Sequence, residues 1–251
     1  MQQQISSQSF ANKIRGSLSA SGGLSYHYLA WKYHCRLWTT FTRQLNESLG
    51  NWRHFSKDLI LIGPSGGYSL SSSFLASFGN IYVYDPDPIA HWIFKKRFPK
   101  ISIHWNETPV LFHPNVDSLR GLWFLKTQHP NAALLLCNVL GQWPLLERVD
   151  ASQMKNWCES LQQIFSGSQW ASYHDLFSTA VSIKKIPQTM LVNPLPLLIE
   201  SHDVERFWYN LGAPSVTDHL TLNIFNNARV RKQLLWPLTP KQLHLIEWVH
   251  G

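Results

Sequence analysis

The stretch LILIGPSGGYSL (59–70) begins as an apolar run and breaks abruptly into glycines and serines. An apolar run that ends at turn residues predicts a short buried strand, which we place at 58–62. The small residues after it let the backbone approach a ligand closely and present amide donors at the start of the next helix, expected at 69–79. The order is therefore strand, glycine loop, helix.

The same alternation continues towards the C-terminus. Apolar runs predict further strands at 80–88, 101–105, 132–137 and 168–177, and helical periodicity predicts helices at 89–98, 116–127, 151–166 and 200–212. Residues 232–249 predict a β-hairpin, and the Pro-rich segment 181–200 receives no assignment. This pattern favours an α/β fold: a doubly wound, mostly parallel sheet with helices on both faces and a C-terminal antiparallel β-hairpin.

Composition indicates a folded globule, because 44% of the 251 residues are hydrophobic and only 15% are charged. Residues 1–23, rich in Gln, Ser and Gly, predict a flexible N-terminal tail. Residues 24–251 predict a single domain whose N-terminal segment is an amphipathic helix at 26–45.

The longest apolar stretch, 132–140, is far shorter than the roughly 20 residues that cross a bilayer. The cysteines Cys35, Cys137 and Cys158 are isolated from one another and show no CxxC spacing, which favours free thiols in a reduced compartment. We therefore predict a cytoplasmic protein without membrane association. The net charge of +7 is by itself weak support for any partner.

Candidate ligand-binding residues follow the predicted strands, because open parallel sheets bind ligands outside the carboxyl ends of their strands. Asp85 ends the second strand about 20 residues after the glycine loop, where a carboxylate accepts both hydroxyl hydrogens of a ribose. Asp87 is a neighbour that could share this task, although Asp-Pro-Asp-Pro is also strong turn chemistry. The small residues after the first strand are Gly63, Ser65, Gly66 and Gly67.

This arrangement resembles the class I S-adenosylmethionine-dependent methyltransferases over roughly residues 58–251. In that family a strand leads into a loop with the pattern acidic, apolar, Gly, any, Gly, any, Gly. LIGPSGG (61–67) matches at Gly63 and Gly67, whereas Leu61 and Ser65 stand where the family has the acidic residue and the middle glycine. The resemblance implies S-adenosylmethionine as cofactor, held by the glycine loop and by Asp85.

The resemblance also implies roles for residues after the third and fourth strands. Asn106 and Glu107 lie where the family contacts the adenine. The segment ALLLCNVLGQWP (133–144) resembles the one after which substrate meets the methyl group, so Asn138 is a candidate for cofactor binding and for catalysis. Trp143, shortly after that strand, is a candidate for substrate binding.

Methyl transfer is an in-line displacement that needs an aligned nucleophile, and a base if that nucleophile carries a proton. Adjacent His and Asp residues in the C-terminal third suggest His174 and Asp175 as catalytic residues and His219 as a substrate contact. Neighbouring residues on a strand face opposite sides, so a structural role for such pairs stays open. We predict no metal, because the His and Asp spacings match no ligand motif.

Three functions remain open at this point. The first is methyl transfer to an unidentified small-molecule, protein or RNA acceptor. The second is a degenerate methyltransferase-like domain that acts as an interaction module, favoured by Leu61 and Ser65. The third is RNA modification, favoured by the basic runs KKR (95–97) and ARVRK (228–232). A dinucleotide-binding dehydrogenase fits less well, since it needs GxGxxG and Tyr68 occupies the third glycine position.

Overall fold

The computed structural model describes residues 23–52, 55–113, 116–147, 149–193, 195–213, 215–225, 228 and 230–251. The predicted tail, 1–23, lies outside these residues except for Gly23, at which the first described helix begins. No helix of this part of the chain is both long and apolar enough to span a bilayer.

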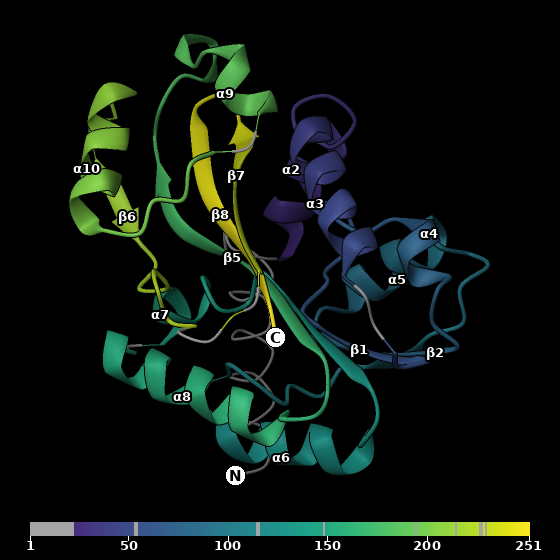
Figure 1. Cartoon of the computed structure of the whole chain (residues 1–251). Coiled ribbons are helices and arrows are strands. Elements are labelled where there is room, and N and C mark those ends of the chain that lie inside the picture. Colours follow the sequence, from purple (N-terminus) through teal and green to yellow (C-terminus); the bar gives the residue numbers. More distant parts are fainter. Residues whose placement is uncertain are drawn as a thin grey trace, which may run out of the picture.

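The described strands form one sheet in the order β3-β2-β1-β4-β5-β8-β7, with β6 paired to β5 (Figure 1). The strands β1 to β5 run parallel to one another, whereas β6 and β8 pair antiparallel with β5, and β7 pairs antiparallel with β8. This confirms the predicted mostly parallel sheet with a C-terminal antiparallel hairpin. The strands are β1 (Asp58–Ile62), β2 (Asn80–Tyr84), β3 (His104–Asn106), β4 (Ala133–Cys137), β5 (Trp170–Thr179), β6 (Val216–Asp218), β7 (Val230–Thr239) and β8 (Gln242–His250).

Helices cover both faces of the sheet, also as predicted (Figure 1). One face packs against α2 (Gly23–Tyr33), α3 (Thr39–Asn51), α4 (Ser72–Leu75) and α5 (Pro88–Arg97), and the other against α6 (Ser118–Gln128) and α8 (Ala151–Ile164). In β1 the side chains alternate between these layers, with Leu59 and Leu61 in the first core and Ile60 and Ile62 in the second. The remaining elements are α7 (Trp143–Leu146), the 3-10 helix η1 (Ile183–Lys185), α9 (Gln188–Val192) and α10 (Ser201–Asn210).

The chain runs outward from β1 to β3 and then returns to place β4 on the other side of β1. The strand order therefore reverses between β1 and β4, which is where open α/β sheets bind their ligands. A ligand-binding site is consequently expected at the carboxyl ends of β1, β2 and β4.

The N-terminal helical segment differs from the prediction, because α2 and α3 replace one helix over 26–45. The break brings Trp38 into the core, where its Nε1 donates a hydrogen bond of 3.0 Å to the carbonyl of Leu238 in β7. The predicted helix over 69–79 is also shorter, since α4 begins only after Ser71, whose hydroxyl caps it. Tertiary packing and a cap thus set these two boundaries.

Gly121 in α6 provides a test of the packing on the second face. A Cβ added there would lie 1.8 Å from the backbone oxygen of Val110, which cannot rotate away. We expect Gly121→Ala to lower the free energy of unfolding by about 2 kcal/mol, in the range of overpacked cores. Urea denaturation measures it.

The matched control is Gly50→Ala near the end of α3, where an added Cβ meets nothing within 4 Å. That change should leave stability unchanged or raise it by up to about 1 kcal/mol, because alanine favours helix over glycine. Equal effects of the two substitutions would show that the contact with Val110 is unimportant.

Candidate functional site

The glycine loop leaves β1 at the point where the strand order reverses. The backbone N–H of Gly63 donates to the carbonyl of Tyr84 at the end of β2, 3.0 Å away. The backbone is left-handed at Gly63, Ser65 and Gly67, with φ of 62°, 51° and 67°, a conformation that favours glycine. An added Cβ would lie 2.3 Å from Val139 at Gly63 and 2.6 Å from Phe98 at Gly67. The loop is therefore packed closely against side chains of its own chain.

Asp85, which directly follows β2, connects the end of this strand with the glycine loop. One carboxylate oxygen accepts the backbone N–H of Ser65 at 2.8 Å, and the other accepts that of Asp87 at 3.0 Å. The side chain is buried, and burial raises its pKa to about 6 although the two N–H groups pull the pKa down. The backbone N–H of Asp85 donates to the carbonyl of Asn106, so the ends of β1, β2 and β3 meet here.

The side chains of Asp87 and Asn106 have local roles. Asp87 caps α5 by accepting the N–H of Ile89 at 2.8 Å, and its second oxygen lies 2.9 Å from Nε2 of His27. Asn106 accepts the N–H of Thr108 at 2.8 Å in a turn. Both lie next to Asp85, but turn chemistry occupies the oxygens with which we expected them to bind a cofactor.

Helix α2 lies over this edge, which the sequence did not indicate. Its His27 contacts the hydroxyl of Tyr68 at 2.8 Å, and His34 donates to the Tyr68 carbonyl at 2.8 Å. The Arg97 guanidinium lies 5.1 Å from the Tyr68 ring centre, and burial raises the pKa of that phenol to about 12. The seven-residue spacing of His27 and His34, typical of one helix face, was the available signal, and in the structure α2 ends at Tyr33, directly before His34.

A second polar group lies at the carboxyl end of β4 and beside the middle of β5. Asn138 follows β4 with φ of 57°, and its side-chain oxygen accepts the N–H of Asp175 at 2.8 Å. Its amide donates back to Oδ2 of Asp175 at 2.9 Å, and Gln142 donates to the same oxygen at 3.2 Å. Two of the predicted catalytic residues, Asn138 and Asp175, are therefore in direct contact.

Two histidines complete this group, which we call the polar cluster: Asn138, Gln142, Asp175, His219 and His244. Nδ1 of His244 lies 2.7 Å from Oδ1 of Asp175. His219 contacts the carbonyl of Gly141 through Nδ1 at 2.6 Å and the hydroxyl of Ser178 through Nε2 at 3.0 Å. Burial alone would raise the pKa of Asp175, but the His244 contact and the Asn138 hydrogen bond hold it below its usual value.

His174 lies apart from the polar cluster, because it points to the opposite side of β5 from Asp175. It is fully buried, with Nδ1 3.0 Å from the hydroxyl of Ser172 and Nε2 3.6 Å from a carboxylate oxygen of Glu247. Burial lowers its pKa to about 3. The two adjacent catalytic candidates, His174 and Asp175, thus lie on opposite faces of β5, and a catalytic role for His174 stays a prediction.

Trp143 also lies apart from the polar cluster. It begins α7 and packs between Phe112 and Trp157 in the core under α8, with ring centroids 4.8 and 5.8 Å away. Its Nε1 donates to Glu147 at 3.1 Å. The structure gives this tryptophan a packing role, and a contact with substrate stays a prediction.

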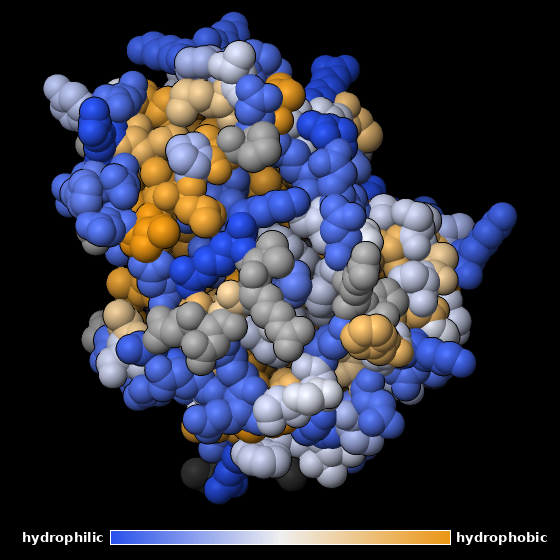
Figure 2. All heavy atoms as spheres, in the orientation of Figure 1, coloured by the Kyte–Doolittle hydropathy of each residue, from blue (hydrophilic) through white to orange (hydrophobic). Residues whose placement is uncertain are grey.

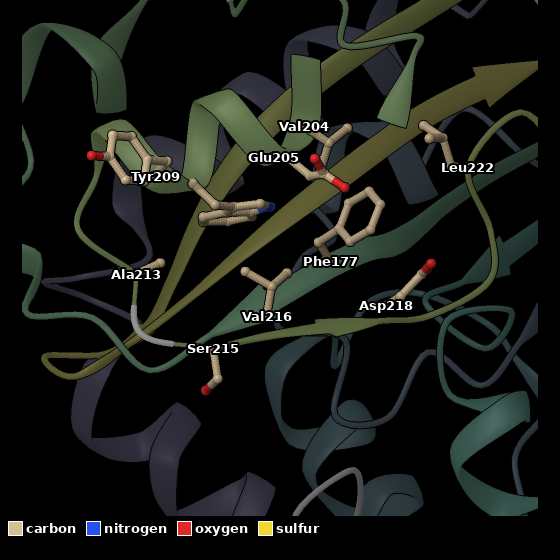
Figure 3. Close-up of a pocket in the computed structure, with 10 residues that line it drawn as sticks. Phe177, Val204, Glu205, Tyr209, Ala213, Ser215, Val216, Asp218 and Leu222 are labelled. Carbon is tan, nitrogen blue, oxygen red and sulfur yellow. The ribbon is translucent and has the colours of Figure 1, made fainter. Parts of the chain in front are cut away.

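A pocket of about 550 Å³ lies between α10 and the β5–β6 pair. Figure 3 shows Phe177, Val204 and Glu205 around it, with Asp218 on the β6 side. Phe177 pairs with Asp218 across the two strands, and these residues follow Asp175 and precede His219 closely in the chain. Two residues of the pocket lining are therefore close in sequence to members of the polar cluster. Figure 2 shows apolar side chains gathered beside α10 on the same face.

Comparisons with known proteins found neither a matching family model nor a matching curated protein. Among solved structures, the chain is similar to the N-methyltransferase NodS from Bradyrhizobium japonicum WM9 in complex with S-adenosyl-L-homocysteine, at 14% identity and a TM-score of 0.41, over 88% of this chain and 87% of that one. It is also similar to an S-adenosylmethionine-dependent methyltransferase from Clostridium acetobutylicum ATCC 824, at 9% identity and a TM-score of 0.42, over 89% and 98%. A third similar structure is magnesium protoporphyrin IX methyltransferase (ChlM) from Synechocystis PCC 6803 with bound SAM, at 9% identity and a TM-score of 0.37, over 84% and 80%. Similarity at this level carries no information on chemistry.

Proposed function

We propose that this protein binds S-adenosylmethionine between the glycine loop and Asp85 and transfers its methyl group to an acceptor held near the polar cluster. The observation that carries the proposal is the buried Asp85 carboxylate, hydrogen-bonded to the loop backbone where the strand order reverses. Nucleotide ligands of open parallel sheets bind at this place.

The donor set at Asp85 fits a ribose. An ionised carboxylate offers about four lone-pair positions, and backbone N–H groups occupy one on each oxygen. Positions therefore remain for the two hydroxyl groups of a ribose. The cofactor supplies an electrophilic methyl group when bound, and this chain's part is to hold it and to exclude water.

The polar cluster is suited to position an acceptor. Asn138 lies at the end of β4, next to β1, and its side chain is locked by two hydrogen bonds to Asp175. Alignment of this kind is the main contribution a protein makes to an in-line displacement. The pocket between α10 and the β5–β6 pair, with Phe177 and two carboxylates in its lining, is the place we propose for a small-molecule acceptor.

A degenerate domain that serves as an interaction module is the second candidate. Its support lies on the side where the family holds the methionine part of the cofactor. Leu61 is fully buried there in place of the acid, and Val139 lies directly against Gly63. A ligand would have to displace the Val139 side chain.

RNA modification has less support. Lys95, Lys96 and Arg97 occupy the last turn of α5, where positive charges favour the helix dipole. Lys96 also lies 4.0 Å from the ring centre of Trp92, and Arg97 covers Tyr68. The second basic run, 228–232, lies only partly within the described residues.

Calorimetry with S-adenosylhomocysteine and with adenosine separates the two candidates. If the methionine side is intact, S-adenosylhomocysteine should bind with one site per chain and at least about tenfold more tightly than adenosine, a difference of about 1.4 kcal/mol. Equal affinities would mean that only the ribose edge survives, which favours the degenerate module. The absence of heat with both ligands and with S-adenosylmethionine would refute the proposed enzyme.

A further inference from the structure

We propose that Asp175, His219 and His244 form a binding site for a divalent transition-metal ion such as Zn²⁺. Their ligand atoms lie within 4.8 Å of one another, and all three side chains are buried. Two imidazoles and one carboxylate are a donor set that Zn²⁺ and other borderline metal ions bind, with further positions left for water or a ligand. The site does not depend on the methyl transfer proposed above.

Charge is the first argument for the site. Asp175 is fully buried, with Oδ1 2.7 Å from Nδ1 of His244 and Oδ2 accepting hydrogen bonds from Asn138 and Gln142. A buried carboxylate is costly unless a positive charge compensates it. A divalent cation bound between Asp175 and the two imidazoles would supply that charge.

Outer hydrogen bonds already orient two of the three side chains, those of His219 and Asp175. Because the Gly141 carbonyl can only accept, Nδ1 of His219 carries the proton and Nε2 carries the lone pair. Asn138 and Gln142 both donate to Oδ2 of Asp175, so that Oδ1 faces His244. Metal-binding histidines and carboxylates are characteristically held by such outer partners.

One ring nitrogen of His244 lacks a hydrogen-bond partner among the described residues. Nε2 of His244 is buried and has no hydrogen-bond partner in the structure. Such an atom costs free energy unless it gains a partner. A metal ion bound through Nε2 of His244 would give this atom its partner.

Binding requires a modest contraction of the cluster. Donor atoms around tetrahedral Zn²⁺ lie about 3.3 Å apart, whereas the three ligand atoms here lie within 4.8 Å. Rotation of the His219 ring away from the Ser178 hydroxyl, 3.0 Å from Nε2, is the smallest change that brings them closer. The bound ion would then tie β5, β8 and the segment after β6 together.

Metal titration of the full chain after chelator treatment tests the proposal. We expect Zn²⁺ and Co²⁺ to bind at one equivalent, Co²⁺ to give the intense visible absorption of a low-coordinate site, and bound Zn²⁺ to raise Tm. His244→Gln and His219→Gln should each weaken binding by more than about 100-fold, the upper end of what loss of an outer partner costs. Gln142→Ala, an outer partner, should weaken it by about 10- to 100-fold.

His202→Gln is the matched control, because His202 is exposed on α10 and lies 3.2 Å from Glu200 and 3.3 Å from Asp203. Its replacement should leave the affinity for the one tightly bound metal ion unchanged. The proposal would be overturned if metal affinity fell in His202→Gln but not in His219→Gln and His244→Gln. It would also be overturned if the wild type bound no stoichiometric metal at pH 8. Should the two cluster variants not fold, Gln142→Ala and the Co²⁺ spectrum of the wild type decide the matter in the same way.

Discussion

Replacement of Asp85 by asparagine should weaken the binding of S-adenosylhomocysteine by about 100-fold. The change removes the charge of a buried acceptor, and hydrogen bonds to charged groups contribute roughly 1.5–3 kcal/mol. Asparagine keeps one side-chain oxygen, so it still accepts one of the two backbone N–H groups that hold the loop, those of Ser65 and Asp87. Calorimetry on both proteins at pH 7.5 measures the difference.

Asp58→Asn is the control for this experiment. Asp58 begins β1 at the opposite edge of the sheet, where its carboxylate accepts the side-chain amide of Asn80 at 2.7 Å. It should bind the ligand as the wild type does. If the two variants lose affinity equally, or if Asp85→Asn loses none, then Asp85 does not hold the ribose.

The pH dependence of binding gives an independent check on the same residue. Burial raises the pKa of Asp85 to about 6, so the carboxylate gains a proton as the pH falls below that value. Wild-type affinity should therefore fall by up to about tenfold per pH unit below pH 6. The asparagine variant has no such proton to gain and should show a flat profile across this range.

Glu247→Gln should change the pH dependence of stability. Glu247 lies in β8 with 1% of its surface exposed, 4.0 Å from Arg231 and 3.6 Å from His174. Burial raises its pKa from 4.5 to about 7, despite the opposing effects of Arg231 and Gln233. The native chain thus keeps this proton at pH values at which the unfolded chain has lost it.

The direction of the pH dependence of stability follows from the difference between the native and the unfolded pKa of Glu247. The stabilisation from the protonated group is fully present below pH 4.5 and is lost as the pH rises through about 7. Glutamine never loses its hydrogens, so the free energy of unfolding of the variant relative to the wild type should rise by about 3 kcal/mol between pH 4 and pH 8. Urea denaturation across that range measures the free energy of unfolding of both proteins.

Glu159→Gln is the control, because Glu159 is exposed on α8 beside Lys155. Its free energy of unfolding should depend on pH as that of the wild type does. A parallel curve for Glu247→Gln would instead mean that Glu247 ionises normally.

The parallel half of the sheet and the edge at Asp85 were predictable because the information is local. β1, β2 and β4 are short apolar runs, each followed by turn residues, and Asp85 comes directly after β2. Strand, loop and helix succeed one another within a few residues, so each element is recognisable without knowledge of its neighbours. The rule that ligands bind at the carboxyl ends then places Asp85 beside the glycine loop.

The polar cluster was only partly predictable because its completion depends on register between distant strands. His244 reaches Asp175 across a sequence separation of 69 residues, through the antiparallel pairing of β5 with β8. The register also shifts at a bulge between Asp175 and Phe177, which periodicity cannot anticipate. The available signal in the sequence was that His244 and Glu247 stand between the apolar residues of the predicted second hairpin strand. Such polar side chains are rarely buried in a strand unless they are paired.

The role of α2 was missed for a different reason. Its amphipathic pattern indicates a helix but not where that helix packs. The contacts of His27 with Asp87 and Tyr68 follow from the turn that separates α2 from α3, and that turn exists because Trp38 is drawn into the core. Side-chain packing between remote segments thus outweighed helix propensity.

The order of the strands also affects how well the protein resists edge-to-edge aggregation. β3 and β7 end the path of hydrogen-bonded strands, and exposed strand edges are templates for aggregation. β3 is only three residues long. β7 carries Pro237, which has no N–H to offer an incoming strand, and the charged residues Arg231 and Lys232 near its start. The long apolar strand β8 instead lies inside the sheet between β5 and β7, where no second chain can pair with it.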